Sequence, residues 1–233
     1  MIVGNGLLAS SFLKSDINFD NFVIFASGVS NSKETNPSQF QREFDLLEDT
    51  ISRNMNKKLI YFSTCSIYEA TPKPYTLHKQ KIEEYIKENV KNFLILRLPN
   101  IVGYSSNENQ LTNYIFSKIV SNSNLVVFEN VSRNLIDVQD IPVITKLLLD
   151  SNTNNLQLDI LFNNETTMKD LIEIFENVLN RKAHAKFQYS DSLNYLVDNK
   201  VFLNLLSNLS DHLVFNTNPQ NIISKYYNAR ENL

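Results

Sequence analysis

Glycine is scarce in this chain, and the few glycines fall where a ligand-binding α/β fold needs them. The 233 residues include four glycines, whereas average usage of about 7% would give roughly sixteen. They follow three strand-like apolar runs, and in chain order they are Gly4, Gly6, Gly28 and Gly103. Glycine is kept where a Cβ would clash with a turn or a ligand, and open parallel sheets bind ligands at the carboxyl ends of their strands. The ends of these three runs are therefore the predicted binding site.

Strand-like and helical segments alternate along the first 100 residues. The apolar runs expected of buried parallel strands cover residues 1–3, 20–26, 58–63 and 92–98. Apolar residues at helical spacing lie between them, over residues 7–14, 40–51 and 75–91. The alternation predicts an α/β fold, with a Rossmann-like parallel sheet flanked by helices.

The pattern changes after Gly103, which suggests a second unit. Helices are expected over residues 111–120, 141–149 and 168–179, and strands over residues 125–128 and 156–162, while the segment after residue 180 is ambiguous. We expect residues 1–100 with about 131–150 to form a Rossmann-like cofactor-binding domain. Residues of about 101–130 with 151–233 then form a small α/β substrate-binding lobe.

Composition excludes several classes of protein. A net charge of −3 and a pI of about 5.7 give no sign of a nucleic-acid surface. One cysteine, Cys65, excludes an internal disulfide and fits a reducing compartment. The three histidines are scattered, so we expect no metal site. No apolar run approaches the ~20 residues of a membrane span, and no secretory leader is evident. A cytoplasmic protein without membrane insertion is the expectation.

The first glycine pair lies in Gly4-Asn5-Gly6-Leu7-Leu8-Ala9, between the first strand and the first helix. A G-x-G-x-x-A turn permits close backbone approach to a pyrophosphate, and the helix N-terminus then faces the phosphates. The alternative is that these glycines only shape the turn.

A second motif supports the nucleotide hypothesis. Tyr75 and Lys79 are spaced i, i+4, so they share one helix face. A tyrosine with a pKa of about 10 is a poor base, and the lysine is expected to lower that pKa. Thr64, at the end of the preceding strand, is placed to hydrogen-bond a substrate oxygen. This trio suits alcohol–ketone interconversion beside a nicotinamide, and the alternative is a solvated helix face.

On these residues the sequence resembles the extended short-chain dehydrogenases/reductases of the NAD-dependent epimerase/dehydratase kind, which act on nucleotide sugars. The resemblance covers residues 1 to about 180. Residues 26–28 resemble the loop along the cofactor, and residues 62–68 the strand with the catalytic hydroxyl. Residues 96–103 are similar to the pattern LRxxNxxG, and residues 133–140 to RxxxxVxD.

The resemblance implies a set of roles. The implied catalytic residues are Thr64, Tyr75 and Lys79. Those implied to bind NAD or NADP are Gly4, Asn5, Gly6, Leu7, Leu8, Ser27, Gly28, Ser63, Tyr75, Lys79 and Pro99. Those implied to bind a nucleotide-sugar substrate are Ser66, Asn100 and Arg133. A homodimer through the helices at 40–51 and 75–91 is also implied.

Simpler roles stay open for some of these residues. Asn100 could only cap a turn. Arg133 could only pair with Asp137 or Asp140. Asp140 is expected to cap the helix that starts near Pro142.

Two departures from the family pattern bear on function. About ten residues separate the first helix from Phe22, where the family has two further strands and a helix, so the sheet is expected to lack edge strands. The adenosine side of the site is then incomplete, since Asp16 and Asp20 precede the wrong strand for the usual acidic residue. Cofactor binding is accordingly weak, completed by a partner subunit, or lost.

The second departure concerns the reaction. Related dehydratases carry an acidic pair after the catalytic Thr, and this chain has Cys65 and Ser66 there, which disfavours dehydration. Ketone reduction, alcohol oxidation or epimerisation remain, in a surface-polysaccharide pathway. The alternative is a non-catalytic binding or regulatory module.

Overall fold

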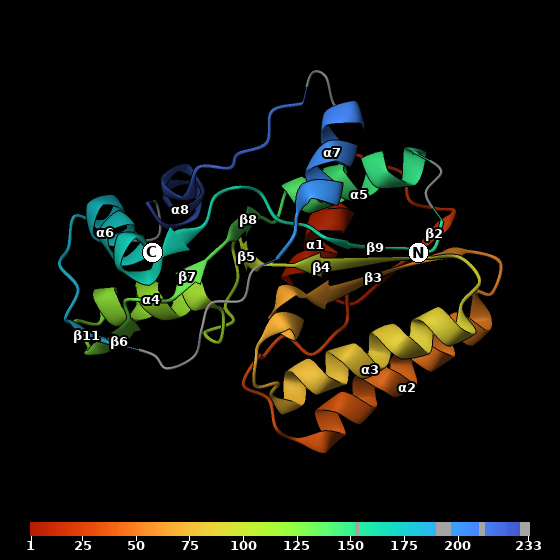
Figure 1. Ribbon diagram of the computed structural model, residues 1–233, viewed down its shortest axis with the longest axis horizontal. Helices are drawn as coiled ribbons and strands as arrows, with labels where there is room; N and C mark the ends of the chain where they lie inside the picture. The colour runs from red at the N-terminus through yellow and green to blue at the C-terminus, as the bar shows by residue number, and fades with distance from the viewer. Residues whose placement is uncertain (152–153, 190–196, 210–212, 229–233) are drawn as a thin grey trace.

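The computed structural model describes residues 1–151, 154–189, 197–209 and 213–228. Its helices and strands form two groups, one around a central sheet and one beside it (Figure 1). Among the described residues, no helix combines the length and apolarity that a bilayer crossing requires.

The central sheet is parallel throughout, which confirms the α/β, Rossmann-like prediction. Its five strands run in the order β1-β2-β3-β4-β9. Their bounds are β1 (Ile2–Val3), β2 (Phe22–Phe25), β3 (Lys58–Thr64), β4 (Phe93–Leu98) and β9 (Leu156–Asp159). The inner strands are apolar almost without interruption because helices cover both faces of the sheet.

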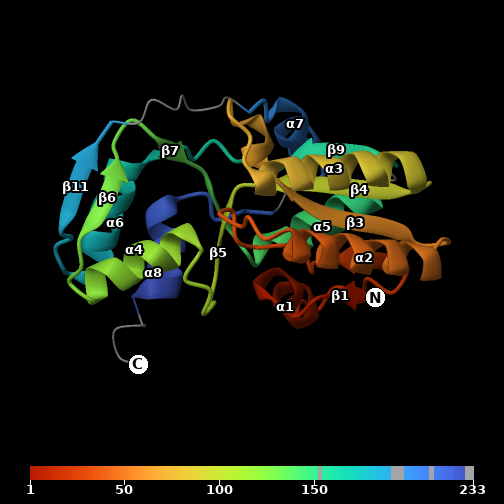
Figure 2. The same ribbon diagram turned by 90° about the horizontal axis from the view of Figure 1, so that it is seen from below.

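Helices cover the sheet in two layers (Figures 1 and 2). One layer holds α2 (Pro37–Arg53) and α3 (Pro74–Asn89), and the other holds α1 (Leu7–Lys14), α5 (Asp140–Asp150) and α7 (Lys200–Leu209). The strand side chains alternate between the layers: Leu59 and Tyr61 belong to the core under α2 and α3, while Ile60 and Phe62 belong to the other core. The two helices of the first layer thus stand directly against β3, where the predicted catalytic threonine ends the strand.

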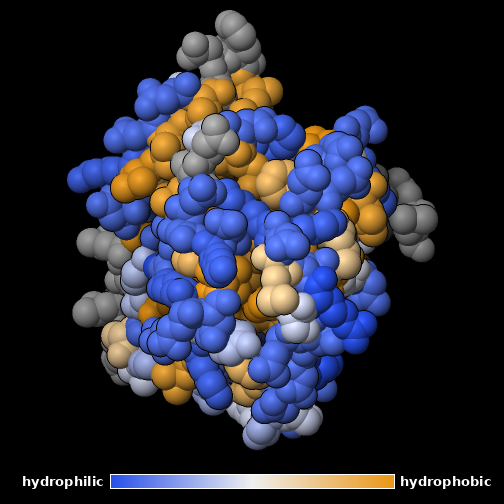
Figure 3. Space-filling model, turned by 90° about the vertical axis from the view of Figure 1, so that its right-hand side faces the viewer, coloured by the Kyte–Doolittle hydropathy of each residue, from blue (hydrophilic) through white to orange (hydrophobic). Residues whose placement is uncertain are grey.

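The strand order confirms that the sheet lacks the further strands that the family has beside β1. β1 pairs with β2 only, with Ile2 opposite Ile24, so β1 forms one edge of the described sheet. An open hollow of about 400 Å³ lies at its amino end, lined in part by Met1, Asp16 and Asp20. The side of the molecule at which the strands of the central sheet begin is mostly hydrophilic, with hydrophobic side chains gathered near its top (Figure 3). Asp16 and Asp20 therefore lie at the opposite end of β1 from the glycine turn.

The second group surrounds a small parallel pair, β6 (Leu125–Phe128) with β11 (Ala185–Gln188). Helices α4 (Leu111–Val120), α6 (Met168–Leu179) and α8 (Pro219–Tyr227) pack together beside it (Figure 2). The side chains of Tyr226 and Tyr227 fill its interior, 1% and 0% exposed. Short pairs connect the groups: β5 (Asn100–Val102) with β8 (Leu135–Asp137), and β7 (Ser132–Arg133) with β10 (Thr166–Thr167).

One segment differs from the expected division of the chain. The sequence predicts that residues 151–233 belong to the small lobe. In the structure, β9 instead pairs with β4 in the central sheet, where Leu158 lies opposite Leu96. Helix α7 packs over the same sheet, against α5. The apolar run at 156–162 carries no signal for which sheet it joins, because both sheets bury such strands equally well.

Candidate active site

The glycine turn has the geometry that close approach to a ligand requires. Gly4 has φ +126°, a conformation that disfavours side chains, and a Cβ there would lie 2.4 Å from the carbonyl oxygen of Ala26. Gly6 caps α1 without a side-chain hydrogen bond, and a Cβ on Gly6 would meet nothing within 4 Å. Asn5 and Gly6 are exposed, while Leu7 and Leu8 are half-buried. The exposed N-terminus of α1 therefore suits an anionic group such as a pyrophosphate.

The predicted catalytic hydroxyls meet at the end of β3. Thr64 Oγ1 accepts a hydrogen bond from the Ser66 amide at 3.1 Å and lies 3.0 Å from Ser66 Oγ. Thr64 thereby caps the short helix η1 (Cys65–Tyr68). Tyr75, in the first turn of α3, is 9% exposed, and the Thr64 side chain lies close enough to its phenol to lower the pKa of Tyr75. Next to them, Ser63 Oγ is buried and has no hydrogen-bond partner among the described residues. Four hydroxyl groups, those of Ser63, Thr64, Ser66 and Tyr75, thus lie near the end of this strand.

Lys79 lowers the pKa of Tyr75 as predicted, but the net shift is upward. Burial raises the pKa of the Tyr75 phenol, the Lys79 charge and the Thr64 side chain offset only part of the rise, and Glu43 adds to it. The spacing of the motif reveals the lysine alone. It does not reveal the burial of the ring or a carboxylate from another helix, and both favour the neutral phenol.

Lys79 lies in a buried ion pair that the sequence analysis did not anticipate. Its Nζ donates to Glu43 Oε1 at 2.8 Å and to Tyr61 Oη at 2.9 Å. The same Nζ lies 5.8 Å from the centre of the Tyr75 ring. Gly28 lies directly over the pair, and a Cβ on Gly28 would come within 2.6 Å of Lys79 Nζ. The loop predicted to line the cofactor is therefore stacked on the ammonium group.

Glu43 accepts hydrogen bonds from three elements of the structure. Tyr61 Oη and the Val29 amide each donate to it at 2.7 Å, and His78 Nε2 lies 3.0 Å from Oε2. Burial alone would raise the pKa of Glu43, but the Lys79 charge and these hydrogen bonds hold it well below the ordinary glutamate value. His78, for which no role is expected from the sequence, contributes to this cluster and stacks on Phe40.

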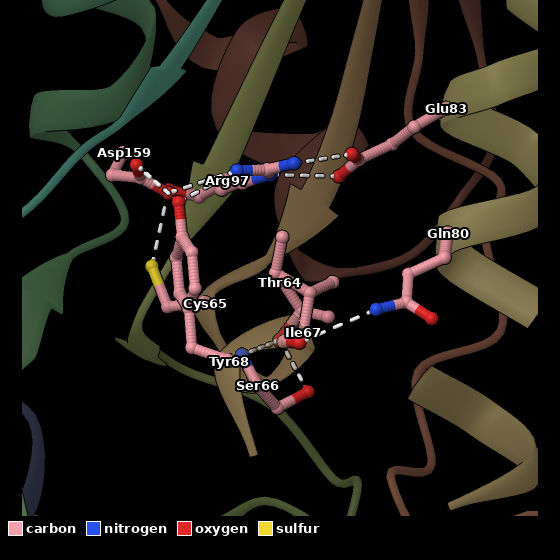
Figure 4. Close-up of polar contacts among 9 residues, drawn as sticks. All are labelled: Thr64, Cys65, Ser66, Ile67, Tyr68, Gln80, Glu83, Arg97 and Asp159. Carbon is pink, nitrogen blue, oxygen red and sulfur yellow. Dashed lines mark hydrogen bonds and ion pairs between the residues drawn. The ribbon is translucent and has the colours of Figure 1, made fainter. Parts of the chain in front are cut away.

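A second, partly buried network contacts η1 through Tyr68 (Figure 4). Arg97 donates two hydrogen bonds to Glu83, at 2.9 and 2.6 Å, and one to Tyr68 Oη at 2.7 Å. Tyr68 in turn donates to Asp159 Oδ2 at 2.8 Å, and burial with this contact raises the pKa of Tyr68 to about 12. Cys65 is buried beside the network, and burial raises the pKa of its thiol, as expected of a packing residue rather than a nucleophile. The network fixes η1, and with it Ser66.

The remaining predicted residues make structural contacts. Asn100 donates to the Asn134 carbonyl at 3.2 Å, and Arg133 donates to the Ser132 carbonyl at 2.7 Å. The carbonyl oxygen of Ser27 accepts a hydrogen bond from Arg42 Nη2 at 3.3 Å. Pro99 separates β4 from β5 and is half-buried.

Two simpler roles considered for this region were wrong. Within the described part of the chain Arg133 makes no ion pair, because Asp137 binds Lys225 at 2.6 Å instead. Asp140 does not cap a helix, because α5 starts at Asp140 itself and Gln139 occupies the cap position. No group of three or more metal-ligating side chains occurs among the described residues.

The parallel sheet and the glycine turn at the end of its first strand define a Rossmann-like α/β protein. The family model described as the NAD dependent epimerase/dehydratase family matches residues 12–160. The chain therefore belongs to that family. A comparison with curated protein sequences found no match.

Solved structures with the same fold include several nucleotide-sugar enzymes. The UDP-N-acetylglucosamine 4-epimerase from Methanobrevibacter ruminantium M1, in complex with UDP-N-acetylmuramic acid, is 16% identical with a TM-score of 0.70, covering 96% of this chain and 82% of the other. The UDP-glucuronic acid 4-epimerase from Bacillus cereus, with UDP-glucuronic acid and NAD, is 15% identical with a TM-score of 0.71, covering 95% and 80%. RMD from Pseudomonas aeruginosa, complexed with NADPH, is 16% identical with a TM-score of 0.68, covering 97% and 87%. At these identities the likeness establishes the fold.

Proposed function

We propose that this protein is an NAD(P)-dependent enzyme that interconverts an alcohol and a ketone on a nucleotide-activated sugar. The observation that carries the proposal is the meeting of Thr64, Tyr75 and Lys79 at the carboxyl end of β3, beside the open glycine turn. Cytoplasmic location, a role in making surface polysaccharide and a homodimer through α2 and α3 belong to the same proposal. The relatives that bind nucleotide sugars support its substrate class.

The residues of the site fit a dinucleotide. Gly6 leaves open space at the N-terminus of α1, where Asn5 and the first-turn amides of Leu7 and Leu8 would meet the pyrophosphate. Gly28 exposes the backbone over Lys79, and Ser63 Oγ has no partner within the described residues. A bound nicotinamide would supply or accept the hydride.

The chain's own groups would handle the proton and the substrate. Thr64 would hydrogen-bond the reacting sugar oxygen, and Tyr75 would exchange a proton with it. Lys79 would orient the nicotinamide ribose with the ammonium N–H that Glu43 and Tyr61 do not use. Ser66, Asn100 and Arg133 would contact the nucleotide sugar, with Pro99 and Ser27 along the cofactor. The small lobe would hold the sugar nucleotide against the Rossmann-like part.

A non-catalytic binding module is the competing function, and the missing strands beside β1 favour it. NAD(P)H oxidation with a panel of UDP- and dTDP-linked 4-keto sugars separates the two. We expect turnover by the wild type and a loss of at least about a hundredfold in Tyr75→Phe, the usual contribution of a general acid. Equal rates for both proteins, or no turnover with any sugar tested, would count against the enzyme.

A further inference from the structure

Glu43 lies beneath the reacting end of the site, and every lone-pair direction of its carboxylate is used. Oε1 accepts from Lys79 Nζ and Tyr61 Oη, and Oε2 lies against His78 Nε2 and the Val29 amide. The residue is 0% exposed. A carboxylate with this many donors is fixed in place and remains ionised.

The carboxylate changes the charge that Tyr75 experiences. Lys79 uses two of its three N–H donors on Glu43 and Tyr61. Since Glu43 lies 2.8 Å from the ammonium, its negative charge offsets part of the effect of Lys79 on Tyr75. Tyr75 therefore faces a compensated pair rather than an isolated cation.

The other groups around Tyr75 do not restore a positive field. Lys79 on the same helix and Thr64 on β3 stabilise the phenolate. Glu43 on α2 and Glu69 after η1 oppose it, and burial opposes it most. Tyr61 on β3 faces the same cluster as a donor to Glu43, and His78 touches the far carboxylate oxygen.

We propose that Glu43 is a positioning residue that anchors Lys79 under Gly28 and keeps Tyr75 a neutral phenol, so that the site is set to reduce a carbonyl. This inference rests on the proposed function. Tyr75 would give its proton to the carbonyl oxygen, while a bound reduced nicotinamide would supply the hydride to the carbonyl carbon and be oxidised, so that C–H and O–H bonds replace the C=O π bond. The Tyr75 phenolate would then regain a proton from water. Alcohol oxidation, which also begins epimerisation through a ketone, would instead need the phenolate at the start.

The test is a pH titration of the ligand-free protein labelled with ¹³Cζ-tyrosine and followed by NMR. Among the ten tyrosines, the Tyr75 signal is the one that Tyr75→Phe removes. We expect a neutral phenol at neutral pH in the wild type, and a titration midpoint at lower pH in Glu43→Gln, because the opposing charge is gone. Glu43→Asp keeps the charge and should restore a midpoint close to that of the wild type.

Glu83→Gln is the matched control. Glu83 is also buried on the layer of α2 and α3 and also pairs with a cation, but its partner is Arg97. We expect the Tyr75 midpoint to stay in place in this variant. The inference is overturned by a Tyr75 phenolate at neutral pH in the wild type, or by equal midpoints in Glu43→Gln and Glu83→Gln.

The wild-type arm stands even if a variant fails to fold. The titration uses no cofactor, so its outcome does not depend on whether the protein binds one. Loss of NAD(P)H binding would therefore end the proposed function without touching the coupling of Glu43 to Tyr75, and the two failures are distinguishable.

Discussion

The carboxylate of Glu43 and the ammonium of Lys79 lie 2.8 Å apart with their side chains 0% and 3% exposed. The pair connects α2 to α3 under the loop that follows β2. It places the lysine of the Tyr-x-x-x-Lys motif inside the protein rather than on a solvated helix face. The same contact therefore contributes to both stability and the proposed chemistry.

Removal of the Glu43 charge should destabilise the protein at neutral pH. Glu43→Gln leaves Lys79 buried without its counter-charge, which typically costs about 3–5 kcal/mol. The folded-state pKa of Glu43 is lowered, so its stabilising effect is complete above the unfolded value of about 4.3 and is lost as the pH falls below it. The difference in the free energy of unfolding between the wild type and Glu43→Gln should accordingly become smaller at acidic pH.

Urea unfolding at pH 7 and at acidic pH measures this difference. Glu84→Gln, an exposed glutamate on α3, is the control and should lie within about 0.5 kcal/mol of the wild type. A Glu43→Gln protein as stable as this control at pH 7 would contradict the buried pair.

The two glycines of the first turn should respond differently to alanine. Gly4→Ala forces a Cβ to within 2.4 Å of the Ala26 carbonyl oxygen at a positive φ, so we expect a loss of at least about 1–3 kcal/mol. Gly6→Ala places its Cβ in open space and should leave the free energy of unfolding close to that of the wild type. Thermal unfolding of both variants checks this, and equal effects would show that the turn is not shaped as described.

Asp140 should weaken the fold as it ionises. Burial, with Asp137 nearby, raises the pKa of Asp140 to about 7. Because the folded value exceeds the unfolded value of about 3.9, its contribution falls as the pH rises between those values. Asp140→Asn should therefore gain stability relative to the wild type at pH 8 but not at pH 4.

Unfolding at the two pH values tests this, with the exposed Asp16→Asn as control. A stability difference for Asp140→Asn that is the same at both values would contradict the raised pKa.

Much of the central sheet could be predicted because its strands carry long apolar runs and its helices have clear periodicity. Residues 111–120, 125–128 and 168–179 fold with the predicted type and bounds. The segment after residue 180 could not be predicted as well, because the short strand β11 and the short helices α7 and α8 share similar apolar content. The pairing of β11 with β6 is a contact between distant segments that local patterns do not encode.

The catalytic trio could be predicted from spacing, but its surroundings could not. Glu43 lies three residues after Phe40 and four residues before Leu47, so it falls within the apolar stripe of this helix. A carboxylate on the buried side of a helix was a signal of a buried cation, and Lys79 is that cation. The pKa of Tyr75 depends on burial and on this tertiary contact, so the motif alone could predict the effect of Lys79 but not the net shift.

The most direct test of the account is titration of the purified protein with NADH and with NADPH, followed by nicotinamide fluorescence. Gly6→Val, which fills the space at the N-terminus of α1, and Tyr75→Phe are the variants to compare. We predict saturable binding by the wild type and Tyr75→Phe and its loss in Gly6→Val. No binding of either dinucleotide at millimolar concentration, or binding unaffected by Gly6→Val, would contradict a nicotinamide site at the glycine turn.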